Sequence, residues 1–364
     1  MRFLAAAVLL VASVSVAAQG GPATRAAAAA RAGWDAVRDG RNQDAARLFA
    51  DAVALEPRDA THHLGVGLSA YLLGRSSDAR ESLRTALDLA PTLTPASLVL
   101  AEILYRESNI DEALRVLEQA QRYAPQDASV AARLETLRAE TTQQRDFFQS
   151  QGSHFTVLFE GPADEAIALR ALEILEEAYF RVGTALYTFP ERPITVVLST
   201  EQQFRDVTRS PEWAAAAYDG RIRVPMRGAL ERDAELQRVL THEFTHALVQ
   251  RIAPRGVPTW LNEGIAVMFE PSGREWAEAT LSNTRGRIPL PRLANGFGSL
   301  SGLEARVAYA QSADAVRQLF DLAGPAAVVA MLQDLAAGRP LAESFEERML
   351  LPFERFAEGV APAN

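Results

Sequence analysis

Apolar positions in the first third of the chain have helical spacing and recur with a fixed period. Pro57, Pro91 and Pro125 stand 34 residues apart, and each follows a run that must end a helix, because proline cannot continue one. Five further columns of small, turn, alanine or large apolar residues keep the same register: Gly33, Gly67 and Ala101; Gly40, Gly74 and Ser108; Ala45, Ala79 and Ala113; Ala52, Ala86 and Ala120; Phe49, Leu83 and Leu117. The pattern predicts pairs of helices joined by short turns, with a further helix from Ala128 to Glu140.

A repeated helix-turn-helix unit with these positions resembles the tetratricopeptide repeat, over about residues 26 to 127. One pair of helices cannot bury its apolar face alone, so stacked pairs build a continuous core and a concave surface. The resemblance implies that this surface binds a peptide or a protein partner. The adjacent His62 and His63 point about 100° apart on a helix, which argues against a metal shared between them.

The hydrophobic period changes after a polar stretch at residues 141–152, which we interpret as a linker. Segments 154–160 and 193–199 are rich in β-branched and aromatic residues, and segment 218–226 alternates charged and apolar residues, so the sequence predicts three strands. Helical spacing marks segments 164–186 and 230–252, and a further helix opens at Pro258. A small mixed sheet followed by helices is an α+β arrangement. We therefore predict α-helical repeats at residues 19–140 and an α+β domain at residues 153–364.

The first residues have the pattern of a secretory signal peptide. Arg2 is followed by a short apolar stretch, Phe3 to Val16, and then by small residues before Gln19. That stretch is too short to span a bilayer comfortably, which needs about 20 apolar residues. The sequence thus predicts a signal peptide at residues 1–18, export to a bacterial periplasm or the exterior, and no membrane span in the mature chain.

Composition narrows the chemistry. The 364 residues carry a formal net charge of −9, which argues against nucleic acid or an anionic membrane as the main partner. Cysteine is absent, so disulfides, thiolate metal sites and a cysteine nucleophile are excluded. Lysine is absent as well, which excludes Schiff-base chemistry. The chain has only five histidines, so their positions carry information.

Two of these histidines form a metal-binding pattern, His242-Glu243-Phe244-Thr245-His246, on the predicted helix 230–252. Histidines four apart project from one face of a helix and can bind one Zn²⁺, while Glu243 lies beside that face as a general base for a water molecule. Glu263 follows 17 positions after His246, beyond a break at Pro258. Two short helices joined by a tight turn can bring its carboxylate to the third ligand position, which is the arrangement of catalytic zinc. The alternative is a helix whose two histidines lie on a solvent-exposed or capped face and bind no metal.

The pair of motifs, His242-Glu243-x-x-His246 and Trp260-Leu261-Asn262-Glu263-Gly264, resembles that of gluzincin metallopeptidases, and especially bacterial peptidase MA-like domains, over about residues 154 to 355. The resemblance implies a zincin-like domain with one zinc ion, held by His242, His246 and Glu263. It implies that Glu270 and Asn262 lie behind these ligands, with Glu270 supporting a zinc-binding histidine. No Gly-x-Met-Glu-Asn stretch precedes the zinc helix, so exopeptidase action is not expected.

The resemblance also implies a tyrosine that stabilises the oxyanion of peptide hydrolysis. We assign Tyr309 to this role, with Tyr218 as the competitor. Substrate is expected to bind along an edge strand at Gly220 to Val224, because a sheet edge offers unpaired backbone groups to a peptide. Gly220, Ile222 and Arg223 are the predicted substrate-binding residues, and alternation leaves Arg221 and Arg223 together near the cleft or in solvent.

The function predicted from the sequence is an exported zinc endopeptidase whose repeats bind a protein substrate or partner. Two alternatives stay open. In one, the protein is a scaffold or adaptor that acts through its repeats, and its metal domain is vestigial. A metal site kept only for structure would not need Glu243 as a general base. In the other, the zinc enzyme hydrolyses amide bonds of cell-wall peptides.

Overall fold

The computed structural model describes residues 21–200, 217–218, 220–225, 233–284 and 286–360, so the predicted signal peptide lies outside the described residues. The chain divides into two compact units. The first consists of Met1–Leu100 and Val116–Val130, and the second of Ala101–Arg115 and Ala131–Asn364. The second unit thus includes parts of the last repeat helices, whereas the sequence placed the boundary after residue 140.

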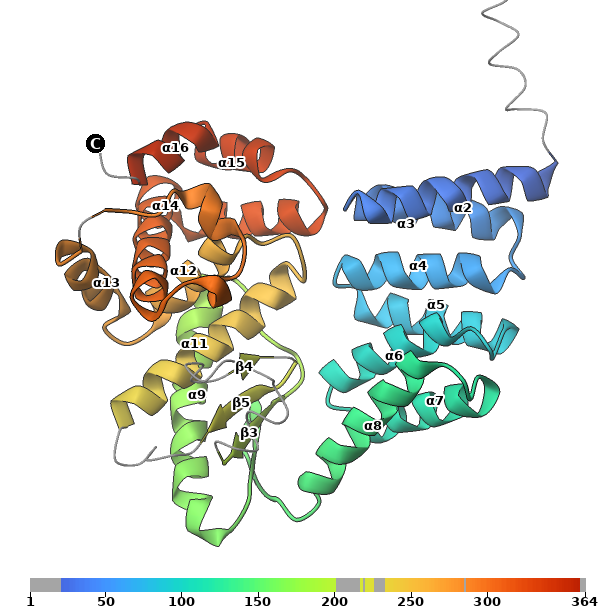
Figure 1. Ribbon diagram of the computed structural model, residues 1–364, viewed down its shortest axis with the longest axis horizontal. Helices are drawn as coiled ribbons and strands as arrows, with labels where there is room; N and C mark the ends of the chain where they lie inside the picture. The colour runs from blue at the N-terminus through green and yellow to red at the C-terminus, as the bar shows by residue number, and fades with distance from the viewer. Residues whose placement is uncertain (1–20, 201–216, 219, 226–232, 285, 361–364) are drawn as a thin grey trace, which may run out of the picture. The chain divides into compact units, whose positions relative to one another are not determined.

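The predicted repeats are confirmed as a run of helices (Figure 1): α2 (Pro22–Arg38), α3 (Asn42–Leu55), α4 (Ala60–Leu72), α5 (Ser76–Leu89), α6 (Thr94–Arg106), α7 (Ile110–Tyr123) and α8 (Ala128–Gln143). Helices α2 and α3 pack together, as do α4 and α5, and α3 also packs against α4. The predicted turn residues Gly40, Gly74 and Ser108 all have positive φ, at 77°, 74° and 59°. A left-handed residue after each first helix reverses the chain and starts the second one.

Small residues let the paired helices approach closely, as the columns of the repeat predict. A Cβ atom added at Gly33 would lie 2.9 Å from the Phe49 ring, and one added at Gly65 only 2.3 Å from it. A Cβ atom at Gly67 would lie 2.7 Å from Leu83. Phe49 and Leu83 are fully buried, so each large side chain of the second helix fills the space left by glycine on a first helix.

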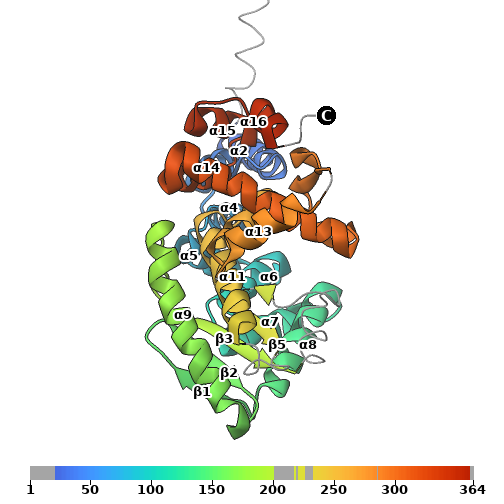
Figure 2. The same ribbon diagram turned by 90° about the vertical axis from the view of Figure 1, so that its left-hand side faces the viewer.

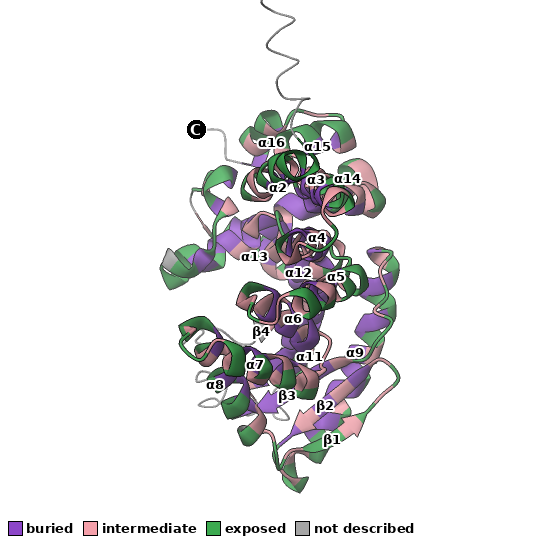
Figure 3. Cartoon of the chain, turned by 90° about the vertical axis from the view of Figure 1, so that its right-hand side faces the viewer, coloured by how far each residue is buried: buried purple, intermediate pink, exposed green. Residues whose placement is uncertain are grey.

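A five-stranded sheet opens the second unit, in the order β1-β2-β3-β5-β4. Its strands are β1 (Phe148–Gln151), β2 (Phe155–Phe159), β3 (Ile194–Ser199), β4 (Ala217–Tyr218) and β5 (Ile222–Pro225). The three central strands are parallel, while β1 and β4 pair antiparallel at the two ends of this order. The buried strand β3 and the half-buried strand β2 lie side by side at its centre (Figure 3).

Helices make up most of the rest of the second unit: η1 (Pro162–Asp164), α9 (Glu165–Ala185), α11 (Asp233–Ile252), α12 (Thr259–Phe269), α13 (Gly273–Ser282), η3 (Leu290–Ala294), η4 (Phe297–Ser299), α14 (Gly302–Ala336), α15 (Leu341–Met349) and α16 (Phe353–Val360). Helix α9 runs along β1 and β2 (Figure 2), and α11 packs against α9, β4 and β5. Both helices therefore cover the same face of the sheet, where Val196, Leu198, Ile222 and Val224 join the core. This is a mostly helical domain with a small sheet, as the sequence predicts.

On the opposite face of the sheet, two buried arginines meet helical segments of the same unit. Arg221 and Arg223 are 4% and 2% exposed, and both donate to Glu140 Oε1 of α8, at 3.0 and 2.7 Å. The Tyr105 hydroxyl of α6 donates to Glu140 Oε2 at 3.0 Å. Two arginines on alternate positions of a strand thus share one buried carboxylate.

Three sequence predictions about this region are wrong. Part of the expected linker is strand β1, which pairs with β2 from Phe148 to Gln151. The expected edge strand is an inner strand, because β4 pairs on its outer side. Arg221 and Arg223 face neither cleft nor solvent, because Glu140 and Tyr105 cover the face on which alternation places them.

Helix α14 is long and apolar enough to cross a bilayer by length and composition, a test that a core helix also passes. Its backbone departs from helical geometry at Gly324, with φ 78°, immediately before Pro325. Val316 and Leu319 on one side of this kink and Val328 and Leu332 on the other are fully buried in the core of the domain.

Candidate metal centre

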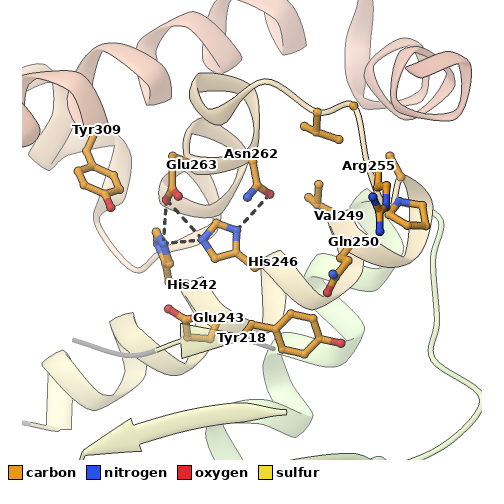
Figure 4. Close-up of a pocket in the computed structure, with 14 residues that line it drawn as sticks. Tyr218, His242, Glu243, His246, Val249, Gln250, Arg255, Asn262, Glu263 and Tyr309 are labelled. Atoms are coloured by element: carbon orange, nitrogen blue, oxygen red, sulfur yellow. Dashed lines mark hydrogen bonds and ion pairs between the residues drawn. The ribbon is translucent and has the colours of Figure 1, made fainter. Parts of the chain in front are cut away.

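Helix α11 presents His242 and His246 one turn apart on one face (Figure 4), and their Nε2 atoms lie 3.0 Å apart. The outer nitrogen of each ring already has an acceptor. His242 Nδ1 lies 2.6 Å from Glu270 Oε1, and His246 Nδ1 lies 3.1 Å from Asn262 Oδ1. Because a carboxylate and an amide oxygen only accept, both Nδ1 atoms donate, which leaves two Nε2 lone pairs pointing toward one space.

Helix α12 brings a carboxylate to the same space. Pro258 caps its start, Trp260 is fully buried, and a Cβ atom added at Gly264 would lie only 2.3 Å from the Ser312 carbonyl of α14. Glycine after Glu263 is therefore required for the close packing of α12 on α14. Glu263 Oε2 consequently lies 3.3 Å from His242 Nε2 and 3.4 Å from His246 Nε2.

The three inward atoms fit a tetrahedral cation. Ligand atoms at ~2.0–2.1 Å from Zn²⁺ lie roughly 3.3 Å apart across a tetrahedral angle, and the observed separations are 3.0, 3.3 and 3.4 Å. Glu263 Oε2 is buried and has no hydrogen-bond partner among the described residues. A buried carboxylate oxygen without a donor beside two facing lone pairs is costly, and one divalent cation would satisfy all three.

Further polar groups hold the two rings in place. Glu270 immediately follows α12, and its Oε1 atom also accepts from Arg238 Nη1 at 3.3 Å. Arg238 in turn is paired with Glu235 at 2.6 Å. The chain Arg238, Glu270, His242 fixes the ring orientation and makes the imidazole more electron-rich, as carboxylates behind metal-binding histidines do.

The electrostatics of the centre favour positive charge. Burial opposes the charged form of His242, but the surrounding carboxylates of Glu263, Glu270 and Glu243 outweigh burial and raise its pKa to about 10. Burial would raise the pKa of Glu263, but His246 and His242 hold that pKa far below its ordinary value. The space between the side chains is thus one in which a cation is strongly stabilised.

Glu243 and two tyrosines complete the surroundings. Glu243 is 6% exposed, and burial raises the pKa of its carboxyl group. Tyr309 stands on the third turn of α14, its ring centroid 6.4 Å from that of His242, and burial together with the charges of Glu263 and Glu243 raises its pKa. The hydroxyl of Tyr309 points toward His242 and Glu263 in Figure 4, whereas that of Tyr218 points away from them.

These side chains line a pocket of about 440 Å³ that also contains the last turns of α11 and the loop to α12. The predicted metal ligands, Glu243, Asn262, Tyr309 and Tyr218 all line it. Glu270 lies directly behind His242. The structure therefore brings together all of the residues assigned to the metal and the chemistry.

The predicted substrate-binding residues do not lie there. Ile222 is fully buried in the core beneath α11, and Arg223 bonds to Glu140 on the other face of the sheet. Gly220, at φ 104°, packs where an added Cβ atom would lie 2.8 Å from Arg106. None of the three lines the pocket, so their assignment to substrate binding from the strand pattern is wrong.

Sequence reasoning also missed functional residues. Arg238 lies one turn before His242, and this spacing was a signal that could have identified it. The pocket wall after His246 had no signal in the sequence, since Gln250 and Val257 belong to a helix end and a loop that no motif covers.

Comparisons with known proteins agree with this layout. The tetratricopeptide repeat family matches residues 30–93 and again 70–137, and the Peptidase MA superfamily matches residues 180–350. Among curated proteins, none matches the chain. Matching solved structures include the first TPR of Spaghetti (RPAP3) bound to the HSP90 peptide SRMEEVD, with 13% identity and a TM-score of 0.32 over 33% of this chain and 98% of that one. The family matches show tetratricopeptide repeats at residues 30–137, followed by a Peptidase MA superfamily domain at residues 180–350.

Proposed function

We propose that this protein is an exported zinc peptidase that cleaves peptide bonds within its substrates, with one Zn²⁺ bound by His242, His246 and Glu263. The observation that carries the proposal is the buried Oε2 atom of Glu263, which has no hydrogen-bond partner among the described residues and faces two Nε2 atoms whose rings are fixed from behind. The match to the Peptidase MA superfamily supports peptidase chemistry. The apolar N-terminal stretch supports export to a bacterial periplasm or the exterior.

The residues around the site have separate roles in peptide hydrolysis. When bound, zinc supplies Lewis-acid chemistry toward the water and the scissile carbonyl. Glu243 takes a proton from the attacking water and passes it to the leaving nitrogen as the peptide bond breaks. The Tyr309 hydroxyl donates a hydrogen bond to the oxyanion. Glu270 and Asn262 keep the two imidazoles in the tautomer that presents Nε2.

We propose that the repeats bind the protein substrate or a partner protein. The tetratricopeptide match at residues 30–137 supports this, because stacked repeats of this kind expose extended concave surfaces. In this arrangement the repeats select the protein, and the pocket of the second unit selects the peptide bond.

Zinc binding is tested directly by replacing a ligand. We expect the mature protein to hold close to one zinc ion per chain, and His246→Ala to lose nearly all of it, since two remaining ligands hold zinc weakly. His63→Ala is the matched control, because its Nε2 atom lies 2.8 Å from the Pro57 carbonyl on the repeats. Elemental analysis of the purified proteins measures the ratio. Equal zinc in the His246→Ala and His63→Ala proteins would contradict the ligand assignment.

The oxyanion donor is tested by removing one hydroxyl. Tyr309→Phe is expected to reduce kcat by about 10²–10³-fold with little change in KM or zinc content, because the lost hydrogen bond forms in the transition state. Tyr218→Phe is the matched control in the same pocket and should keep kcat within a few-fold. Steady-state kinetics on a fluorogenic peptide decide the matter. The opposite ranking of the two variants would assign the role to Tyr218.

A further inference from the structure

The pocket continues beyond the metal-binding side chains and ends at a positively charged residue. Val249, Gln250 and Ala253 line it from the last turns of α11, and Arg255 and Val257 line it from the loop that follows. In Figure 4, Arg255 and Gln250 stand at the end of the pocket away from Tyr309. Substrate that reaches the catalytic groups therefore has an aliphatic wall and one guanidinium within its reach.

Among the described residues, Arg255 has no carboxylate partner, unlike two other arginines of this unit. Arg238 is paired with Glu235 and Glu270, and Arg223 with Glu140. Within the described ranges, no ion pair or hydrogen bond involves the Arg255 guanidinium, and it is the only arginine among the described lining residues. The two carboxylates of the pocket, Glu243 and Glu263, face the histidines instead.

The backbone on both sides of Arg255 is restricted. Pro254 restricts φ on one side of Arg255, and Gly256 on the other has φ 83°. A Cβ atom at Gly256 would lie 3.1 Å from the Leu335 carbonyl of α14, so the loop sits against the backbone of that helix. A guanidinium on a restricted backbone needs less backbone ordering to bind its ligand, and its fork matches a carboxylate in two hydrogen bonds.

We propose that Arg255 is a specificity-determining residue that binds a carboxylate of the peptide substrate; this rests on the peptidase function proposed above. The carboxylate belongs to an acidic side chain or to the free C-terminus of the peptide. The helical rise from His246 to Gln250 and Ala253 is about 6–10 Å, which corresponds to about two to three residues of an extended peptide. The carboxylate is thus expected within three residues of the scissile bond, with Val249 and Val257 contacting its aliphatic stem.

The test is a library of octapeptides with randomised positions, cleaved by the zinc-loaded protein and read by mass spectrometry. We expect cleaved peptides to be enriched about tenfold for Asp or Glu, or for a free C-terminus, at one position within three residues of the cleaved bond. Arg255→Gln should abolish the enrichment and Arg255→Glu should replace it with a preference for Lys or Arg. Arg251→Glu is the matched control, an exposed arginine one turn earlier that does not line the pocket, and should keep the wild-type profile.

A second library with amidated C-termini separates the two sources of the carboxylate. The preference survives amidation if the ligand is a side chain and disappears if it is the terminus. The proposal is overturned if the wild type shows no acidic preference, or if Arg255→Glu gives the same profile as the wild type.

Failure of the peptidase function itself would look different, because no peptide would be cleaved by any of the proteins. Binding then decides the role of Arg255 without turnover. The Glu243→Gln protein, incubated with the same octapeptides and recovered by size exclusion, should retain acidic peptides. The double variant Glu243→Gln/Arg255→Glu should not retain them. Equal retention by the two proteins would overturn the proposal.

Discussion

Replacing Glu243 by glutamine is expected to leave zinc content and folding unchanged and to lower kcat by about 10²–10⁴-fold. The amide has the shape of the carboxylate but cannot accept the proton of the attacking water. Glu243 does not contribute an atom to the group of His242, His246 and Glu263 that faces the metal position, so zinc should stay. Peptide turnover and elemental analysis of the same preparation measure both quantities.

Glu358→Gln provides the control for this variant, since Glu358 is exposed on α16 in the same unit. It should have wild-type turnover. Retention of half the wild-type rate by Glu243→Gln would mean that another group is the base. Loss of zinc together with activity would mean that Glu243 supports the metal and would leave its role as base without support.

The parts of this protein that the sequence predicted well depend on local spacing. The period of 34 residues predicted the helix pairs because the helices of a pair are close in sequence and meet through local contacts, such as Gly33 with Phe49 and Gly67 with Leu83. The metal-facing side chains could be predicted for the same reason. His242 and His246 share one helix, and only a short break separates them from Glu263.

The error about the two arginines arises because their partners are distant in sequence. Alternation correctly placed Arg221 and Arg223 on one face of a strand, but it carries no information about what covers that face. Glu140 and Tyr105 lie some 80 and 120 residues earlier. Strand β1 has a near partner in β2, but its segment Phe148–Gln151 is mostly polar and lacks the alternation that predicts a strand. Arg255 was not recognised either, because the sequence does not show that its side chain lines the pocket or that it has no carboxylate partner among the described residues.

The buried charges of Arg221, Arg223 and Glu140, on the face of the sheet opposite α11, give the largest expected effect on the stability of the second unit. Glu140→Gln removes the carboxylate shared by Arg221 and Arg223 and leaves two buried guanidinium groups without that counter-charge. Removing one partner of a buried ion pair costs about 3–5 kcal/mol, which corresponds to a decrease in Tm of about 6–20 °C for a domain of this size. Glu135→Gln, at an exposed position of the same helix, should change Tm by less than about 2 °C. Calorimetry of the full chain checks both, and equal Tm values would show that Glu140 does not stabilise the second unit.

The carboxyl group of Glu140 also makes the stability of the protein depend on pH. Burial would raise the pKa of Glu140, but the charges of Arg223 and Arg221 outweigh burial and hold the pKa below its ordinary value of 4.5. A carboxyl whose pKa is lower in the folded protein stabilises it fully above the unfolded value, and this contribution is lost as pH falls from about 4.5 through the lower folded value. The difference in Tm between the wild type and Glu140→Gln should therefore be constant near neutral pH and shrink below about pH 4.5. A difference that stays constant on acidification would mean that the lost stability comes from packing rather than from charge.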